Sequence, residues 1–307
     1  MNLAEKDKNY IWHPFTQMKN ADSPIQIERA KDAILYSADG KEYIDAISSW
    51  WVNLHGHANE FIAESIAKQA KSLEQVIFAG FTHQPAIKLA ERLIQVLAGH
   101  FSKIFFSDNG STAVEVAIKM ALQYWHNQGI HNKIKIIAFS NAYHGDTFGA
   151  MSAGARSIFN AAFNPLLFEV HHIPVPNENT IEAIQTQFLQ LANEDNIAAF
   201  IFEPLVQGAG GMLMHKAEQL DQLIAIAKEK NILCIADEVM TGFGRTGKNF
   251  AINYLHHQPD IICLSKALPV VLCHWGLPPV HKKYSMPFMQ MKWRKPFFMA
   301  TPTLPTR

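Results

Sequence analysis

Two ionisable residues late in the chain each follow an apolar run of strand length. Asp237 comes directly after residues 232–236, Ile-Leu-Cys-Ile-Ala, and Lys266 comes just after residues 261–264, Ile-Ile-Cys-Leu. Each run is typical of a short buried strand. Because the carboxyl ends of parallel strands open onto one crevice, the sequence predicts that this carboxylate and this amine face the same site.

An acid and a lysine in one crevice suit pyridoxal phosphate (PLP). The amine of Lys266 can form a Schiff base, and Asp237 can keep the pyridine nitrogen protonated so that the ring accepts electrons. Each residue also has an ordinary interpretation, a lysine at a strand exit and an aspartate that caps a turn. Other parts of the chain decide between the two interpretations.

A polar loop after another expected strand has the composition of an anion site. Residues 103–107 predict a strand, and Asp-Asn-Gly-Ser-Thr at 108–112 leads into an expected helix through Trp125. The free N–H groups and the dipole of a helix start favour a phosphate, by about 0.3–1 kcal/mol from the dipole alone. Gly110 allows close backbone approach, although Ser111 or Thr112 could equally be an ordinary N-cap. The loop is neither a Walker P-loop nor a GxGxxG motif.

Further strands and helices alternate along the middle of the chain. Residues 135–139 predict a strand, and Tyr143 in its exit loop could lay an aromatic face on a planar cofactor. Residues 198–202 predict a strand that ends at the carboxylate of Glu203, and a helix at 220–227 precedes the strand at Ile232. This alternation predicts an α/β fold with a mostly parallel sheet.

The N-terminal part has a different pattern. Residues 10–18 are aromatic and contain Pro, which predicts an extended segment, and residues 34–45 predict a hairpin with an Asp-Gly turn. Trp50 and Trp51 cannot both point inward on one strand, so one of them is expected to line a cavity or an interface. Residues 59–97 have mainly a helical period.

Composition excludes several function classes. Among 307 residues, 27 basic and 27 acidic side chains cancel, which gives no electrostatic reason to expect nucleic acid or an anionic membrane as a partner. The three cysteines form no CxxC pair, which suggests a reducing, cytoplasmic location. The sequence has no apolar signal core, no membrane-spanning run and no metal-ligand spacing among its 15 histidines.

With these residues in view, the chain resembles the class III (ω-type) PLP aminotransferases. The class-level motifs are Gly-Ser-Thr at 110–112, Tyr-His-Gly at 143–145, Glu-Pro at 203–204, Ala-Asp-Glu at 236–238, Gly-Phe-Gly-Arg-Thr-Gly at 242–247, and Pro-Asp-Ile at 259–261 leading to Lys266. Narrower motifs are WHPFTQM at 12–18, SSWW at 48–51, FAGFTH at 78–83, AVEVAIKMALQYW at 113–125, YHGDTFGAMS at 143–152 and VQGAGGM at 206–212. The resemblance runs from about residue 10 to Leu268.

The resemblance implies a fold and a domain organisation. The fold is the aspartate-aminotransferase type, fold type I, with an α/β large domain around a mostly parallel sheet. Residues 1–55 would form an N-terminal arm and hairpin that belong to the small domain, and residues 56–268 an incomplete PLP-binding large domain. The small C-terminal domain is expected to be absent from this chain. The intact protein is expected to be a cytoplasmic homodimer.

The resemblance also implies residue roles. Lys266 is similar to the Schiff-base lysine, which moves the proton as well, and Asp237 to the pyridine-nitrogen acid. The phosphate cradle matches Gly110 and Ser111, with Thr112 adjacent. Tyr143 matches the aromatic residue at the ring, which also contacts substrate. Glu203 and Gln207 look like family positions beside the cofactor. No metal is implied.

Two aromatic residues are implied to bind substrate. Trp50 matches a substrate-pocket aromatic. Phe15 stands where the family usually has a tyrosine implicated in recognising 8-amino-7-oxononanoate, so a hydroxyl donor is lost. The narrower motifs resemble members of biotin biosynthesis that transfer an amino group from S-adenosylmethionine to this acceptor, giving 7,8-diaminononanoate.

Two alternatives stay open. The chain could be another ω-aminotransferase, acting on ornithine, GABA or a diamine, although Trp50, Trp51 and residues 12–18 suit a long carbon chain better. It could also be a non-catalytic fragment that binds PLP or a partner without turnover.

The composition changes at Pro269. All 27 acidic residues precede it, and residues 269–307 are rich in Pro, Lys and Arg without a helix or strand period. Read one base earlier with allowed codons, residues 269–276 become T-G-G-V-M-P-L-G, which resembles the family sequence after its lysine. We therefore predict that the tail 269–307 is out of frame and disordered, and that this truncated product is inactive or insoluble.

Overall fold

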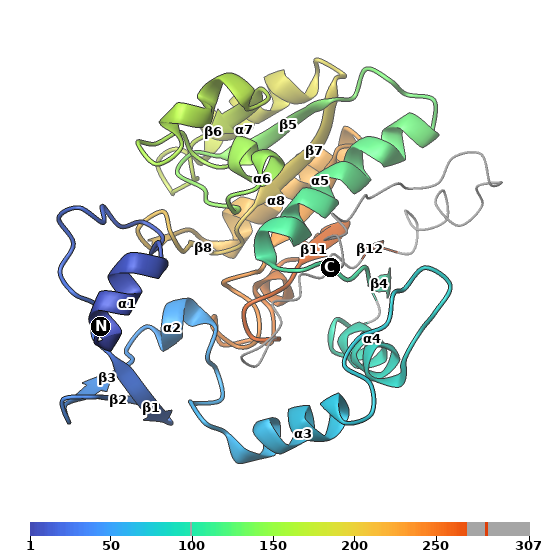
Figure 1. Cartoon of the computed structure of the whole chain (residues 1–307). Coiled ribbons are helices and arrows are strands. Elements are labelled where there is room, and N and C mark those ends of the chain that lie inside the picture. Colours follow the sequence, from blue (N-terminus) through green and yellow to red (C-terminus); the bar gives the residue numbers. More distant parts are fainter. Residues whose placement is uncertain (99, 269–279, 282–307) are drawn as a thin grey trace. The chain divides into compact units, whose positions relative to one another are not determined.

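The computed structural model describes residues 1–98, 100–268 and 280–281 (Figure 1). The chain divides into two compact units, Met1–Val76 and Ile77–Arg307. The predicted tail therefore lies outside the described residues, except for residues 280–281.

The first unit contains a small antiparallel sheet. Strands β1 (Ile27–Lys31), β2 (Ile34–Ser37) and β3 (Glu42–Ile44) lie in the order β1-β2-β3, which confirms the predicted hairpin. Helix α1 (Leu3–Tyr10), which the sequence analysis did not predict, starts with a capping box between Asn2 and Glu5. The prediction of an extended segment at residues 10–18 is only partly correct: Tyr10 ends the helix, Ile11 is extended, and turns follow at residues 14–15 and 18–20, with Phe15 at φ 53°. Helix α3 (Glu60–Ala70) completes the unit.

The element α2 (Ser48–Trp51) is a left-handed turn. Its four residues have φ of 48°, 48°, 56° and 65°, in a region that costs about 1–2 kcal/mol per non-glycine residue. Asp45 offsets part of this cost, because its carboxylate accepts the N–H of Ser49 at 2.9 Å and the hydroxyl of Ser49 at 2.7 Å. The same carboxylate lies 2.9 Å from Nε2 of His57.

The second unit is built on a seven-stranded sheet with the order β4-β12-β11-β10-β7-β5-β6 (Figure 1). Strands β11, β10, β7, β5 and β6 are parallel, and β12 is antiparallel to both neighbours. The strands are β4 (Phe101–Lys103), β5 (Lys135–Phe139), β6 (Val170–Ile173), β7 (Ile197–Phe202), β10 (Leu233–Asp237), β11 (Ile261–Cys263) and β12 (Val280–His281). The predicted α/β fold with a mostly parallel sheet is thereby confirmed.

Helices and short elements connect these strands. The helices are α4 (Gln84–Val96), α5 (Gly110–Asn127), α6 (Phe148–Ala153), α7 (Ile181–Ala192) and α8 (Ala217–Glu229), with 3-10 turns η1 (Ala161–Leu166) and η2 (Ala251–Tyr254) and a small hairpin of β8 (Val206–Gln207) and β9 (Leu213–Met214). No described helix has the length and apolar character needed to cross a membrane.

Strand β4 ends earlier in the chain than the sequence predicts. We expected residues 103–107 to be extended in the sheet, but β4 ends at Lys103. The described partner of β4 is β12, which contacts it only at Phe101 and Lys103, so the hydrogen-bonded ladder ends there. Ile104 and Phe106 instead pack partly buried against the core.

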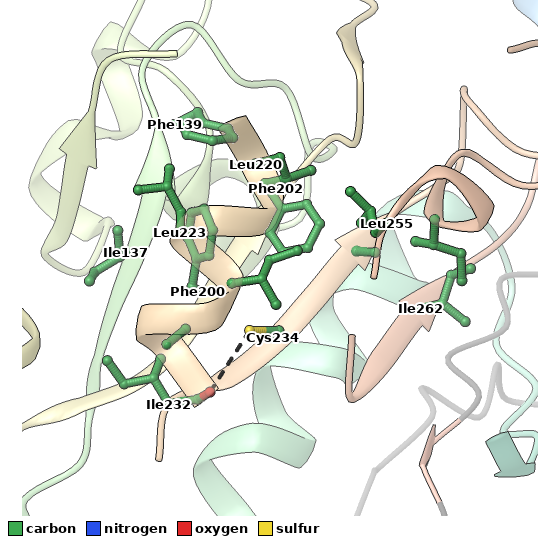
Figure 2. Packing of buried hydrophobic residues seen from close by; sticks show 14 of the residues in the cluster. Ile137, Phe139, Phe200, Phe202, Leu220, Leu223, Ile232, Cys234, Leu255 and Ile262 are labelled. Atoms are coloured by element: carbon green, nitrogen blue, oxygen red, sulfur yellow. Dashed lines mark hydrogen bonds between the residues drawn. The ribbon is translucent and has the colours of Figure 1, made fainter. Parts of the chain in front are cut away.

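Apolar side chains cover both faces of the sheet. Along β5, Ile137 and Phe139 belong to one core cluster and Ile136 and Ala138 to the other, because successive strand residues point to opposite faces. On the first face, Leu220 and Leu223 of helix α8 pack near the phenylalanines of β5 and β7 (Figure 2). On the second face lies α5, whose small residues allow close packing. This sandwich fixes the carboxyl ends of the strands, where the polar residues gather.

Candidate functional site

Asp237 and Lys266 leave the sheet at the same end. Asp237 is the last residue of β10 and is paired with Cys263, the last residue of the parallel strand β11. Lys266 follows Cys263 by three residues. The structure therefore brings the acid and the amine to neighbouring strand ends, as the two apolar runs predicted.

A buried histidine holds the carboxylate of Asp237. Nδ1 of His144 lies 2.7 Å from Oδ2 of Asp237, and the N–H of Val239 donates to Oδ1 at 3.1 Å. Burial lowers the pKa of His144, but the hydrogen bond and charge of Asp237 outweigh it, so the pKa is raised overall. The pair is thus a buried contact between an imidazole and a carboxylate. His144 was not predicted as a site residue, although its place beside Tyr143 after a strand was a signal in the sequence.

Lys266 is half-buried, and its surroundings favour the neutral amine. Burial lowers the pKa of Lys266, and the positive charge of Arg245 lowers it further. The negative charges of Asp237 and, more weakly, Glu203 raise it, but the pKa is lowered overall. A lysine with a lowered pKa has more of the unprotonated, nucleophilic form near neutral pH.

The start of α5 lies against the loop that follows β10. The N-cap is Asn109, not Ser111 or Thr112, because the Asn109 side chain accepts the N–H of Thr112 at 2.9 Å and the Thr112 hydroxyl accepts the N–H of Asn109 at 2.9 Å. The next N–H groups, of Gly110 and Ser111, have no intrahelical acceptor in an α-helix. A Cβ on Gly110 would lie 2.8 Å from Cγ1 of Val239, so a larger residue here would require the Val239 side chain to shift.

The loop after β5 closes over the same helix start. Gly145 has φ +126°, and a Cβ there would collide with the side chain of Ser111. The hydroxyl of Ser111 accepts the N–H of Asp146 at 3.1 Å. Tyr143 donates its hydroxyl to Asp146 at 2.9 Å, and the residue is 41% exposed. Burial and then the charge of Asp146 raise the pKa of Tyr143.

Glu203 fixes the backbone around this crevice. Its carboxylate accepts the N–H of Tyr143 at 3.1 Å and that of Gly208 at 2.9 Å. Burial raises the pKa of Glu203 to about 7. Gln207 donates to the carbonyl of Ser140 at 2.9 Å.

Several buried polar atoms in this region have no hydrogen-bond partner among the described residues. They are Nε2 of His144, Oε1 of Gln207 and Oγ of Ser265. Unpaired buried polar groups are costly and call for a partner, so these atoms fit a site that receives a polar ligand.

Phe15 and Trp50 belong to the first unit, whereas the other candidate residues belong to the second. Their ring centroids lie 5.6 Å apart at 69°, an edge-to-face contact. Both remain more than half exposed, at 61% and 55%. They form an aromatic pair, and core packing is not their role in this unit. Among the described residues, no group of three or more acidic, His or Cys side chains could hold a metal ion.

Comparisons with known proteins agree on one family. The family model for class-III aminotransferases matches residues 16–270. A curated relative, the adenosylmethionine-8-amino-7-oxononanoate aminotransferase of Synechococcus elongatus, is 54% identical over 267 residues, which cover 84% of this chain and 63% of the relative. The enzyme of the same name from Staphylococcus aureus is 42% identical over 282 residues, covering 87% of this chain and 62% of the relative.

Solved structures are similar over most of the chain. The adenosylmethionine-8-amino-7-oxononanoate aminotransferase of Methanocaldococcus jannaschii has a TM-score of 0.87 at 35% identity, covering 93% of this chain and 66% of that structure. The ω-transaminase of Pseudomonas jessenii in complex with PMP has a TM-score of 0.88 at 30% identity, covering 94% and 67%. The chain thus spans somewhat less than two thirds of the length of the curated relatives it matches.

Proposed function

The chain belongs to the class-III aminotransferases, and from this premise we propose that its second unit binds PLP and takes part in amino-group transfer. PLP, the cofactor of this family, supplies an electron sink that stabilises a carbanion beside its ring. The observation that carries the proposal is the placement of Asp237, held by His144, and Lys266 at the ends of two paired parallel strands.

The residues present fit the cofactor. The N–H groups of Gly110 and Ser111 at the start of α5 would hold the phosphate, with Thr112 in the capping box beneath them. Asp237 would bind the pyridine nitrogen, since His144 and the N–H of Val239 fix the position of its carboxylate. Tyr143 would lie on the ring, because Asp146 holds its hydroxyl and Glu203 holds its backbone.

Lys266 would act as both nucleophile and proton carrier. Its lowered pKa favours the neutral amine, which would hold the cofactor covalently and, once released by an incoming amine, would carry a proton. Glu203 and Gln207 line the crevice, and Gln207 still has an acceptor oxygen to offer.

For substrates, we propose S-adenosylmethionine as the amino donor and 8-amino-7-oxononanoate as the acceptor, in biotin biosynthesis. The support is the name shared by relatives up to 54% identical to this chain. Trp50 and Phe15 are proposed to contact the acceptor, whose long carbon chain suits exposed aromatic rings. A cytoplasmic homodimer is proposed for the intact protein.

The experiment that tests the proposal is cofactor capture. The chain, with its reading frame restored, is mixed with PLP, reduced with borohydride and digested, and the modified peptide is mapped. We expect label on Lys266 and none in Lys266→Ala, with Lys228→Ala as a control that labels normally. Label at another lysine would refute the assignment.

Amine donors then separate the two alternatives. Turnover with ornithine, GABA or a diamine but not with S-adenosylmethionine would indicate another ω-aminotransferase. PLP capture without turnover by any donor would indicate a binding fragment.

A further inference from the structure

Glu115 is a half-buried carboxylate in the second turn of α5 that the proposed chemistry does not use. Its Oε2 accepts the hydroxyl of Thr147 at 2.7 Å and the N–H of Ala150 at 3.1 Å. Thr147 is the N-cap of α6, but its side chain makes no cap hydrogen bond. Ala150 is the third residue of α6, where an N–H has no intrahelical acceptor. Glu115 therefore supplies from α5 the cap that α6 lacks.

The backbone at the start of α6 lies directly against this carboxylate. A Cβ on Gly149 would come within 2.5 Å of both carboxylate oxygens of Glu115. The glycine thus permits an approach that any other residue would block, and it keeps the N–H of Ala150 within reach of Oε2.

The loop that precedes α6 also contacts Ser111 at the start of α5. The hydroxyl of Thr147 lies 3.3 Å from the carbonyl oxygen of Ser111, and the N–H of Asp146 donates to the Ser111 hydroxyl at 3.1 Å. A serine hydroxyl that accepts one hydrogen bond still has its own hydrogen to donate. These contacts therefore leave the O–H of Ser111 available to a phosphate oxygen.

We propose that Glu115 is a positioning residue, which holds residues 145–150 on the start of α5 and thereby keeps the Ser111 hydroxyl in place for the cofactor phosphate. The inference rests on the proposed function and extends it to a residue one helical turn beyond the phosphate cradle. Without Glu115, Thr147 and Ala150 lose the acceptor that they share, and the contact of Asp146 with Ser111 loses its support.

Both contacts go to one oxygen, so the role predicts a definite order among variants. Glutamine keeps one acceptor oxygen, which can take the place of Oε2, whereas alanine keeps none. We therefore expect Glu115→Gln to hold the loop and Glu115→Ala to release it. A role that depended on the negative charge would be lost in both variants.

The first measurement is amide hydrogen exchange without PLP, in the chain with its reading frame restored. Mass spectrometry follows the peptide that covers residues 143–150. In Glu115→Ala its exchange should become faster by roughly tenfold, because local opening costs less free energy, and in Glu115→Gln it should stay within about twofold of the wild type. Gln123→Ala, which removes a contact with Asn127 at 2.8 Å further along α5, is the matched control and should leave the exchange unchanged.

The second measurement compares the binding of PLP with that of pyridoxal, which lacks the phosphate. In Glu115→Ala the Kd for PLP should rise by roughly tenfold, while the Kd for pyridoxal should change by less than about twofold. Thr147→Val should give a smaller rise for PLP, and this rise should largely disappear in the Glu115→Ala background, because both changes break the same contact.

Unchanged loop exchange or an unchanged Kd for PLP in folded Glu115→Ala would overturn the proposal, and Thr147→Val decides if the alanine variant does not fold. An equal loss of PLP and pyridoxal binding would also overturn it, because the effect would then not pass through the phosphate cradle. A wild-type chain that binds no PLP would refute the proposed function, and the exchange measurement would still decide whether Glu115 holds the loop.

Discussion

Asp237 is the residue whose charge has the clearest chemical purpose. Its carboxylate lies 2.7 Å from Nδ1 of the buried His144, which fixes its position at the end of β10. At a pyridine nitrogen, that charge would stabilise the protonated ring and the carbanion that forms after proton loss.

We predict that Asp237→Asn, in a chain with its reading frame restored, still binds PLP through the phosphate cradle. The rate of the amino-donor half-reaction should fall by about 100-fold or more, because the amide cannot hold the nitrogen proton. Stopped-flow absorbance of the cofactor measures this rate. Near-normal rates would remove Asp237 from the role. Asp260→Asn, which alters another buried carboxylate that accepts the N–H of Cys234 at 2.7 Å, provides the control.

Glu203 gives a prediction for pH. Its pKa is raised by burial to about 7, so the folded protein holds this proton where the unfolded chain has released it. The free energy of unfolding should therefore fall as pH rises from about 4.5 to 7, by roughly 1–3 kcal/mol from this group. Urea unfolding of Glu203→Gln should lack this part of the slope; an unchanged slope would contradict the assignment.

At the scale of elements, the sequence predicted what depends on local pattern. The apolar runs before Asp237 and Lys266 correctly predicted strands β10 and β11. The Asp-Gly turn correctly predicted the hairpin of β2 and β3. The end of β4 at Lys103 was not predictable, because it depends on a partner strand more than 170 residues away in the chain. The His144–Asp237 contact spans 93 residues and was missed for the same reason.

The left-handed turn at residues 48–51 was not predicted either, because Ser-Ser-Trp-Trp contains no glycine, the residue that usually indicates a positive φ. The backbone strain in this turn can be tested by substitution. Ser48 has φ 48°, so Ser48→Gly should stabilise the first unit by about 1 kcal/mol through relief of the Cβ clash. Ser65→Gly, inside helix α3, should destabilise it by about 0.5 kcal/mol. Chemical denaturation measures both, and equal effects would exclude strain at the turn.

At the scale of the whole molecule, the family match and the compositional change fall at nearly the same position. The family model ends at residue 270, and no acidic residue follows Pro269. Residues 269–307 lie almost entirely outside the described structure, so the reading frame is a proposal that stands on the sequence. Only every third base of the back-translated tail is adjustable, yet the shifted frame gives T-G-G-V-M-P-L-G directly after Leu268.

We predict that one base is missing at the Leu268–Pro269 junction. Resequencing codons 266–276 tests the cause, since a sequence whose bases do not permit T-G-G-V-M-P-L-G in the shifted frame would refute it. Expression tests the consequence. Restoring the base should give a longer, dimeric and active aminotransferase, while the 307-residue chain should be inactive or insoluble, because out-of-frame residues would replace those that the family has after its lysine. Robust turnover by the 307-residue chain would show that the second unit completes the site without the in-frame continuation.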